Sequence, residues 1–218
     1  MTHVLVLRPE PGAGITADKA RKLGMRPLVA PLFQIEAVEW QAPDAANFDG
    51  VLLTSANAIR CAGEQLSSYR GLKAYAVGEA TAESARHAGF DIASTGESGV
   101  ERLLASIEPD LKLLHLAGED RHAAPAARQA ITTVAVYRSI EITDPKLRPN
   151  PGDVAMIHSP RAGRRFAELV RDRTPIGVAA ISEAAAAAAG AGWMKVEIAE
   201  KPNDEALLAL AARLCKNA

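Results

Sequence analysis

The strongest constraint on the fold of this chain is an internal repeat, in which residues 51–105 recur, diverged but in register, about 104 positions later. The segment Leu53-Thr54-Ser55-Ala56-Asn57-Ala58 aligns with Ile157-His158-Ser159-Pro160-Arg161-Ala162, and each closes an apolar run. Further along, Ala76-Val77-Gly78-Glu79-Ala80 aligns with Ala180-Ile181-Ser182-Glu183-Ala184. The chain is therefore interpreted as two diverged copies of one α/β unit. Matching loops in two copies suggest a ligand held between the halves.

Short apolar runs rich in β-branched residues alternate with Ala-rich helical patterns along the whole chain. The strands are predicted at 4–7, 27–33, 51–54, 73–77, 91–94, 112–116, 132–137, 154–158, 177–181 and 195–199. The helices are predicted at about 15–23, 57–67, 79–88, 98–106, 122–130, 161–171, 183–190 and 203–216. This alternation indicates parallel sheets covered by helices on both faces. Two sheets of five strands each would have the size of a flavodoxin-like doubly wound sheet.

The repeat leaves two assemblies open. The chain could fold as two sequential halves, or its first quarter could pair with its last half while the middle forms a domain of its own. The predicted crossovers between the halves are 34–47 and 139–151, which contain Pro, acidic residues and β-type runs. Periodicity does not choose between these assemblies.

Composition excludes several classes of protein. The 218 residues are 48% hydrophobic and 23% charged, with a formal net charge of −1, which is typical of a globular chain and provides no general nucleic-acid footprint. Cys61 and Cys215 cannot form a disulfide framework, and the five His show no metal-ligand spacing, so we expect a reducing compartment and no metal. The most apolar window, 184–194, is shorter than the roughly 20 residues of a membrane span. We expect a cytoplasmic protein without a membrane or nucleic-acid partner.

A glycine pattern near the N-terminus formally fits a dinucleotide fingerprint. Gly12-Ala13-Gly14-Ile15-Thr16-Ala17 matches G-x-G-x-x-A, and Glu36 lies about where a ribose-binding acid would be. However, Pro9 and Pro11 separate the predicted strand from Gly12, whereas the first glycine should close the strand-to-helix turn directly. An ordinary loop is the preferred interpretation, with a nucleotide-dependent reductase as the alternative.

The loops that follow the predicted strands are better candidates for a binding site. Thr54-Ser55-Ala56-Asn57 and His158-Ser159-Pro160-Arg161 place hydroxyls and backbone N–H groups at a helix start, where carboxylates or phosphates bind. Helix capping alone would explain either serine. Their occurrence in both copies favours a shared polyanionic ligand.

Arginines cluster near these predicted edges, and guanidinium groups suit carboxylates. The candidates are Arg8, Arg121, Arg138 and Arg161, together with Arg164 and Arg165, which could simply solvate a helix face. Tyr137 closes a predicted strand beside a crossover. Catalytic triads, nucleophile elbows and Walker loops are absent from the sequence, so a hydrolase or kinase assignment has no support.

The order and spacing of five motifs resemble the uroporphyrinogen-III synthase family over about residues 3–214. The motifs are Arg8-Pro9, Phe48-Asp49-Gly50-Val51-Leu52-Leu53-Thr54-Ser55-Ala56-Asn57-Ala58, Ala76-Val77-Gly78-Glu79-Ala80-Thr81-Ala82, Val136-Tyr137-Arg138 and Ser159-Pro160-Arg161. The chain departs from the family at Ile181-Ser182-Glu183-Ala184-Ala185, where the family typically has I-G-x-T-T. Any contact that the missing threonine hydroxyls would make falls to Ser182 or to backbone N–H groups.

The resemblance implies two flavodoxin-like doubly wound parallel-sheet domains joined by a two-stranded β ladder. Residues 1–36 and 143–218 would form one domain and 40–138 the other, with crossovers at 35–42 and 138–147. It also implies a lyase that dehydrates and cyclises hydroxymethylbilane, a linear tetrapyrrole with eight carboxylates, into uroporphyrinogen III with inversion of ring D and without a cofactor. We expect a monomer.

The resemblance also assigns roles to residues. Tyr137 is the expected proton donor, and the phenol, being a weak acid, should contribute modestly. Substrate binding is expected from residues of the strand-end loops and from arginines: Arg8, Thr54, Ser55, Ala56, Asn57, Gly78, Arg121, Arg138, Ser159, Arg161 and Ser182. Holding the flexible substrate in its ring-inverting conformation would be the larger task. The rival from another class is a non-catalytic two-domain receptor for a small anionic ligand.

Overall fold

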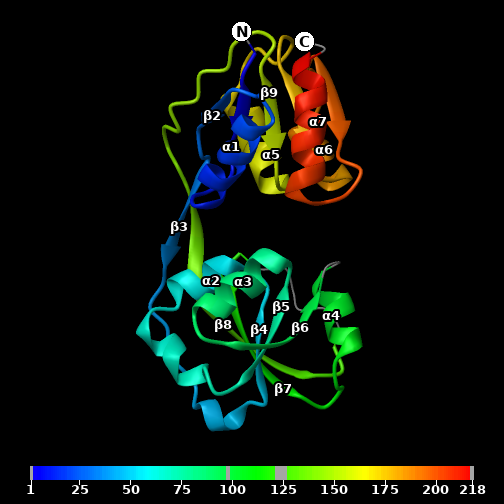
Figure 1. Ribbon diagram of the computed structural model, residues 1–218. Helices are drawn as coiled ribbons and strands as arrows, with labels where there is room; N and C mark the ends of the chain where they lie inside the picture. The colour runs from blue at the N-terminus through cyan, green and yellow to red at the C-terminus, as the bar shows by residue number, and fades with distance from the viewer. Residues whose placement is uncertain (1, 97–98, 121–126, 217–218) are drawn as a thin grey trace. The chain divides into compact units, whose positions relative to one another are not determined.

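The chain divides into two compact units, which are coloured along the sequence in Figure 1. This computed structural model describes residues 2–96, 99–120 and 127–216. Unit 1 comprises Met1–Gln34 and Ile140–Ala218, and unit 2 comprises Ile35–Ser139. The chain therefore crosses between the units twice, at 34/35 and at 139/140.

Unit 1 contains a parallel sheet of five strands within the described part of the chain, in the order β11-β10-β9-β1-β2. The strands are β1 (Val4–Val6), β2 (Pro27–Val29), β9 (Val154–Ile157), β10 (Gly177–Ala180) and β11 (Lys195–Ile198). The helices are α1 (Gly12–Lys22), α5 (Pro160–Leu169), α6 (Glu183–Ala189) and α7 (Asp204–Lys216).

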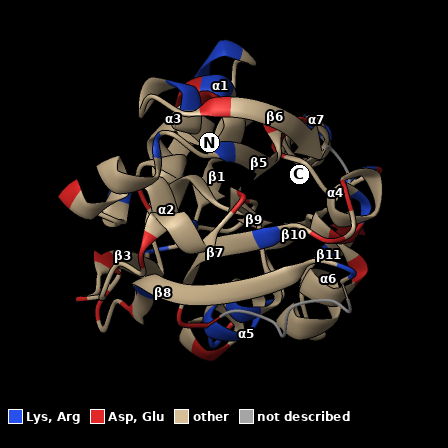
Figure 2. Cartoon of the chain, turned by 90° about the horizontal axis from the view of Figure 1, so that it is seen from below, with Lys and Arg blue, Asp and Glu red and all other residues tan. Residues whose placement is uncertain are grey.

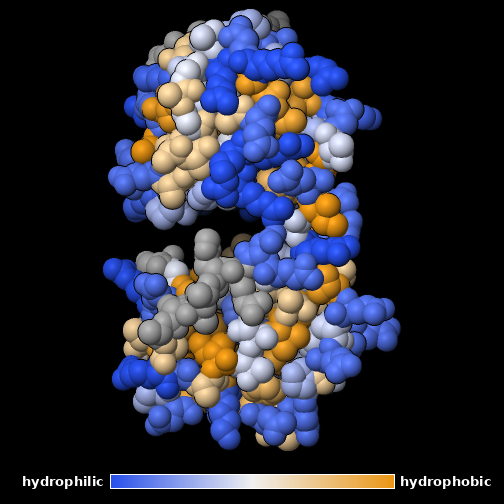
Figure 3. Space-filling view, turned by 180° about the vertical axis from the view of Figure 1, so that it is seen from behind, coloured by the Kyte–Doolittle hydropathy of each residue, from blue (hydrophilic) through white to orange (hydrophobic). Residues whose placement is uncertain are grey.

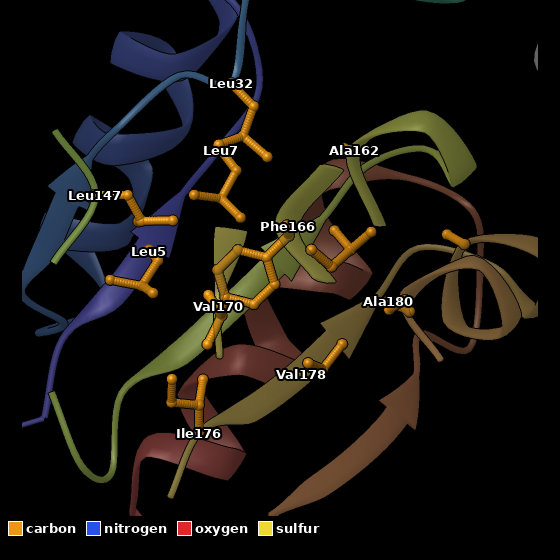
Figure 4. Close-up of a cluster of buried hydrophobic side chains, with 14 of the residues drawn as sticks. Leu5, Leu7, Leu32, Leu147, Ala162, Phe166, Val170, Ile176, Val178 and Ala180 are labelled. Carbon is orange, nitrogen blue, oxygen red and sulfur yellow. The ribbon is translucent and has the colours of Figure 1, made fainter. Parts of the chain in front are cut away.

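Helices cover both faces of this sheet because successive residues of a strand point to opposite faces. Leu5 of β1 and Leu7, which follows the strand, pack with Phe166 of α5 in one cluster, part of which is drawn in Figure 4. Val4 and Val6 of β1 instead pack in a second cluster with the buried sides of α1 and α7. Continuous apolar strands of this kind are expected of a sheet buried on both faces.

Unit 2 contains a six-stranded sheet in the order β3-β8-β7-β4-β5-β6, counted over its described residues. The strands are β3 (Phe33–Ala37), β4 (Gly50–Leu53), β5 (Lys73–Val77), β6 (Asp91–Gly96), β7 (Lys112–Gly118) and β8 (Ala130–Glu141). The helices are α2 (Ala56–Cys61), α3 (Glu79–His87), α4 (Val100–Ser106) and the 3₁₀ helices Ala45–Asn47 and Glu64–Tyr69.

Strands β4 to β8 pair in parallel, whereas β3 and β8 are antiparallel. The N–H of Ile142 donates to the carbonyl of Leu32 at 2.9 Å, and the N–H of Val38 donates to the carbonyl of Val136 at 3.1 Å. Residue numbers thus fall along β8 as they rise along β3, which defines an antiparallel ladder. Both crossings of the chain, at 34/35 and 139/140, lie in these two paired strands.

The two sheets share one spatial order although the chain enters them at different strands. The repeat makes β9, β10 and β11 the counterparts of β4, β5 and β6, and the orders β11-β10-β9-β1-β2 and β6-β5-β4-β7-β8 then coincide. The units are therefore circular permutants of one five-stranded, doubly wound plan, and unit 2 adds β3 at its edge. The predicted α/β class with parallel sheets is confirmed.

Several predicted elements were wrong in extent. The strand predicted at 27–33 is two strands, β2 and β3, in different sheets, separated by Ala30-Pro31-Leu32. The sixth strand of unit 2, β3, was not among the ten strands predicted from periodicity, although it lies largely within the predicted crossover 34–47 and forms, with β8, the two-stranded ladder that the resemblance implied. The helix predicted at 57–67 ends at Cys61, because Gly63 adopts a φ of +68° and a 3₁₀ helix follows.

The helix predicted at 122–130 lies mostly outside the described residues. Its described end, 127–130, is not helical, and Ala130 already begins β8, which is longer than the predicted strand 132–137. Within the described part of the chain no helix is long and apolar enough to span a membrane. On the face drawn in Figure 3, hydrophilic residues cover much of the surface of each unit.

Candidate functional site

In unit 1 the predicted binding residues follow three neighbouring strands at the carboxyl edge of the sheet. Arg8 follows β1, Ser159 follows β9 and Ser182 follows β10, and these strands are adjacent in the order β10-β9-β1. The order reverses between β9 and β1, because β9 leads to β10 while β1 leads to β2 on the other side. Ligands of open α/β sheets bind at such a switch point.

The three predicted serines all cap helices. The hydroxyl of Ser159 accepts from the N–H of Ala162 at 3.2 Å, and that of Ser182 accepts from the N–H of Ala185 at 3.3 Å. In unit 2 the hydroxyl of Ser55 accepts from the N–H of Asn57 at 3.2 Å. These hydroxyls are therefore engaged locally, and a ligand at these loops would meet chiefly backbone N–H groups.

The carboxyl edge of unit 2 has its own switch point, between β4 and β7. Thr54 follows β4, and its hydroxyl lies 3.0 Å from Nε2 of His115, a buried residue of β7. Gly78 follows the neighbouring strand β5 with a φ of +81°, a conformation that favours glycine, and it precedes helix α3. Thr54-Ser55-Ala56-Asn57 and Gly78 thus follow adjacent strands at one edge.

Tyr137 reaches the same edge from β8, where it is paired with Gly118, the last residue of β7. Its ring lies on Gly118 so closely that a Cβ atom there would be 2.8 Å from Cε2 and from Cζ. The ring is half-buried against the core of unit 2. Within the described residues the Tyr137 hydroxyl has no hydrogen-bond partner.

The predicted arginines have different surroundings. Arg138 follows Tyr137 on β8 and forms an ion pair with Glu36 of β3 at 3.2 Å. The guanidinium of Arg161 lies 4.6 Å from the centroid of the Phe33 ring, as a cation–π contact. Arg164 is exposed, and Arg165 pairs with Glu141 and Glu168. Figure 2 marks the basic residues of α5 in blue. Arg121 lies outside the described residues.

The glycine pattern at Gly12–Ala17 does not form a dinucleotide loop. Gly12 and Gly14 lie in the first turn of α1, so the expectation of an ordinary loop was also wrong. Residues 7–11 separate the end of β1 from this helix. Among the residues that the structure describes, no three His, Cys, Asp or Glu are grouped so that they could hold a metal ion.

The structure adds a polar cluster that the sequence did not predict, centred on Asp204 at the start of α7. Its Oδ1 accepts from the Thr16 hydroxyl at 2.9 Å and lies 3.1 Å from Nε2 of His158. Nη1 of Arg8 lies 3.4 Å from the same oxygen, and Nζ of Lys19 lies 3.3 Å from Oδ2. We call these five residues the Asp204 cluster.

Asp204 can take part in this cluster because its neighbour caps the helix. The side chain of Asn203 accepts from the N–H of Ala206 at 2.9 Å, which leaves the Asp204 carboxylate free to turn towards β1 and β9. The only sequence signal was an acidic residue at the start of a predicted helix, which is typical of ordinary helix starts. The sequence did not predict the cluster because Asp204 is far from Arg8 and His158 along the chain.

Electrostatics fix the charges within the cluster. Burial would raise the pKa of Asp204, but hydrogen bonds from His158 and Thr16 and the charge of Arg8 outweigh it and hold this pKa well below its usual range. Burial lowers the pKa of His158 below its usual value, although Asp204 opposes the shift. A neutral imidazole therefore donates from Nε2 to an ionised carboxylate near pH 7.

These features define a class of protein: a two-unit α/β protein with doubly wound sheets, in which helix-start loops follow the strands at the carboxyl edge of each sheet. The sequence profile of the family described as Uroporphyrinogen-III synthase HemD matches residues 15–209. The chain belongs to the uroporphyrinogen-III synthase family.

Individual relatives agree with this assignment. A curated uroporphyrinogen-III synthase of Chlorobaculum parvum is 27% identical over 119 residues, which are 50% of this chain and 48% of that protein. The alignment thus spans about half the length of the curated relative.

Two crystal structures share the fold. Uroporphyrinogen-III synthetase of Helicobacter pylori superposes with a TM-score of 0.70 at 17% identity, covering 98% of this chain and 100% of that chain. A mutant uroporphyrinogen III synthase of Thermus thermophilus superposes with a TM-score of 0.58 at 17% identity, covering 100% of both chains.

Proposed function

We propose that this protein is a uroporphyrinogen-III synthase, a lyase that closes hydroxymethylbilane to uroporphyrinogen III with loss of water and inversion of ring D. The product is the precursor of haem, sirohaem and cobalamin in tetrapyrrole biosynthesis. The observation that carries the proposal is the family match over residues 15–209. The geometry of both carboxyl edges is consistent with it.

A substrate with eight carboxylates needs many dispersed donors rather than one strong catalytic group. The residues assigned to bind it are distributed over both units: Arg8, Ser159, Arg161 and Ser182 in unit 1, and Thr54, Ser55, Ala56, Asn57, Gly78, Arg121 and Arg138 in unit 2. Because the serine hydroxyls cap helices, the backbone N–H groups of these loops are the expected donors. Most of the catalytic effect would come from holding the linear tetrapyrrole in the conformation that inverts ring D.

The chemical step starts with the hydroxymethyl group. Its C–O bond breaks, and the oxygen leaves as water once it receives a proton. We assign Tyr137 as the donor of that proton, because it stands at the carboxyl edge beside Gly118 with a hydroxyl that no described residue engages. The carbon that lost the oxygen then bonds to ring D. Inversion breaks the existing bond between ring D and its bridge carbon and re-forms it at the other α-carbon of ring D, whose proton leaves and balances the proton that Tyr137 gave. Since a phenol is a weak acid near neutral pH, its share of the rate should be modest.

An isomer assay tests this proposal. The purified protein is supplied with hydroxymethylbilane, the products are oxidised, and the type I and type III uroporphyrins are resolved. We expect type III product in proportion to the amount of protein. Product of type I alone, at the rate without protein, would refute the enzyme and leave the anion receptor, and turnover that required a nicotinamide nucleotide would favour the reductase.

The remaining parts of the proposal concern how the protein works as a molecule. We propose that it acts as a cytoplasmic monomer without a cofactor, and that units 1 and 2 are its two domains. Light scattering during chromatography measures the mass, for which 23.0 kDa is expected. The isomer assay in the presence of a chelator and without added cofactor tests the catalytic requirement.

A further inference from the structure

We propose that Asp204 is a positioning residue that holds the guanidinium of Arg8 ready for a carboxylate of the ligand. The inference rests on the proposed function, because Arg8 is assigned there to substrate binding. It concerns residues of unit 1 alone, at the switch point between β1 and β9. Neither the resemblance nor the residues first singled out as a site includes Asp204.

Two contacts fix the guanidinium from two sides. On one side Nη1 of Arg8 lies 3.4 Å from both the Thr16 hydroxyl and the Asp204 carboxylate. On the other side the guanidinium packs against Gly12, where a Cβ atom would be 2.7 Å from Nε, 3.0 Å from Cζ and 3.1 Å from Nη2. The guanidinium of Arg8 is thus clamped between Asp204 and Thr16 on one side and Gly12, in the first turn of α1, on the other.

The clamp leaves part of the guanidinium available. Nε and Nη2 of Arg8 have no hydrogen-bond partner among the described residues, and the side chain is 36% exposed. An arginine offers two such nitrogens to one carboxylate in a fork. The Asp204 carboxylate itself is 18% exposed and already accepts from Thr16 and His158. The cluster therefore presents the cation of Arg8 to a ligand more openly than it presents its own anion.

The clamp orders the Arg8 side chain before the ligand binds, so binding does not have to immobilise it. Immobilising a long side chain on binding costs about 0.5–1.5 kcal/mol, which corresponds to about a 2- to 12-fold change in affinity. Against this stands repulsion between Asp204 and an anionic ligand, which removal of Asp204 would relieve. A substitution that moves Arg8 without changing any charge separates these two effects.

Gly12→Ala is that substitution. Its Cβ displaces the end of a flexible side chain, while alanine is a better helix former than glycine, so the fold should not suffer. We expect KM for hydroxymethylbilane to rise about 2- to 12-fold with kcat near wild type. Asp204→Ala should raise KM in the same direction.

Combination with Arg8→Ala decides whether Asp204 acts through Arg8. If it does, neither Gly12→Ala nor Asp204→Ala raises KM further in the Arg8→Ala background. Glu205→Ala is the matched control, because Glu205 is an exposed acidic residue in the same turn of α7 and forms no hydrogen bond or ion pair with the cluster in the described part of the chain. This control should leave KM unchanged.

Other outcomes overturn the inference. The inference is wrong if Asp204→Ala lowers KM in protein that keeps Arg8. It is also wrong if Asp204→Ala raises KM by the same factor in protein with Arg8 and in the Arg8→Ala variant. Asp204→Asn, which keeps an acceptor for Thr16, replaces Asp204→Ala if the alanine variant does not fold. Asp204→Asn should raise KM by a smaller factor than Asp204→Ala. If Asp204→Asn and Gly12→Ala both have the KM of the wild type, the clamp is refuted.

A binding measurement keeps this result separate from that of the proposed function. The dissociation constant of uroporphyrin III, an octacarboxylate, is measured by fluorescence for the same variants and requires no turnover. Wild-type protein that forms no type III product but shows the coupled change in this constant refutes the proposed function and supports the clamp. Active wild-type protein without the coupling refutes the clamp alone.

Discussion

Substitution of Gly118 should separate the position of Tyr137 from its chemistry. In Gly118→Ala the new Cβ would lie 2.8 Å from Cε2 and Cζ of Tyr137, whereas carbon atoms in contact are about 3.5–4.0 Å apart. The ring must therefore move by about 1 Å, and a displacement of that size at a reacting group can cost about 100-fold in rate. We expect kcat to fall about 10- to 100-fold, with KM little changed.

Tyr137→Phe supplies the comparison. It removes the hydroxyl and keeps the ring, and we expect kcat to fall about 10- to 100-fold, at or below the low end of the usual worth of a general acid. The double variant Gly118→Ala/Tyr137→Phe should be no slower than Tyr137→Phe, because displacing a ring without its hydroxyl has no further effect on the proton. Steady-state kinetics with hydroxymethylbilane and thermal unfolding give both readouts.

A matched control lies at the opposite edge of the same sheet. In Gly50→Ala at the start of β4, the Cβ would lie 2.7 Å from Cε2 of Tyr75 and 2.9 Å from the carbonyl oxygen of Lys73. This variant should lose stability by about 1–3 kcal/mol from overpacking and keep its kcat. A wild-type kcat for Gly118→Ala, or an equal fall for Gly50→Ala, would refute the role given to Tyr137.

Three further expectations can be checked on purified variants. Replacing Ser55 or Ser159 by Ala should lower the free energy of unfolding by only about 1 kcal/mol, from the lost helix cap. Replacing either serine by Asp should repel the substrate and raise KM strongly. An unchanged KM in both Asp variants would place the binding site elsewhere. The folded-state pKa of His158 is lowered, so as the pH falls the unfolded state binds a proton at His158 before the folded state does. The urea midpoint of the wild type should therefore fall as the pH drops below about 6.5, and His158→Asn should reduce that fall. Parallel plots of urea midpoint against pH for the two proteins would contradict the shift. Gly163→Ala places a Cβ 2.8 Å from the carbonyl oxygen of Ala185 and 2.9 Å from the amide nitrogen of Ala189, so α5 and α6 must separate. The free energy of unfolding should fall by about 1–3 kcal/mol. A wild-type melting temperature would refute this expectation.

The fold class could be predicted from the sequence because local periodicity and the repeat point to the same plan. Apolar runs such as Val51–Thr54 and Val154–His158 become buried strands β4 and β9, followed by the helix caps Ser55 and Ser159. The break after β2 could not be predicted in this way, because the run from Pro27 to Phe33 is apolar throughout. Only tertiary pairing assigns its two ends to different sheets.

The candidate site was predicted in part. Each copy of the repeat placed its own strand-end loops at one carboxyl edge, since parallel strands end on the same side of a sheet. The Asp204 cluster was missed because its members come from α1, α7 and the ends of β1 and β9, and no local pattern links Arg8 to a residue 196 positions away. The pairing of Tyr137 with Gly118 was hidden for the same reason, since it depends on the register of β7 and β8.

The central claim is that tetrapyrrole carboxylates bind at the loops that follow the strands of both sheets. Backbone amide NMR of the uniformly labelled protein, titrated with uroporphyrin III, tests it most directly. The account predicts that the largest shifts fall on Ser55-Ala56-Asn57, Gly78 and Ser159, with smaller shifts at the amino ends of the strands, such as Gly50 and Gly177. Shifts confined to those amino ends, or no shift at saturating uroporphyrin III, would contradict it.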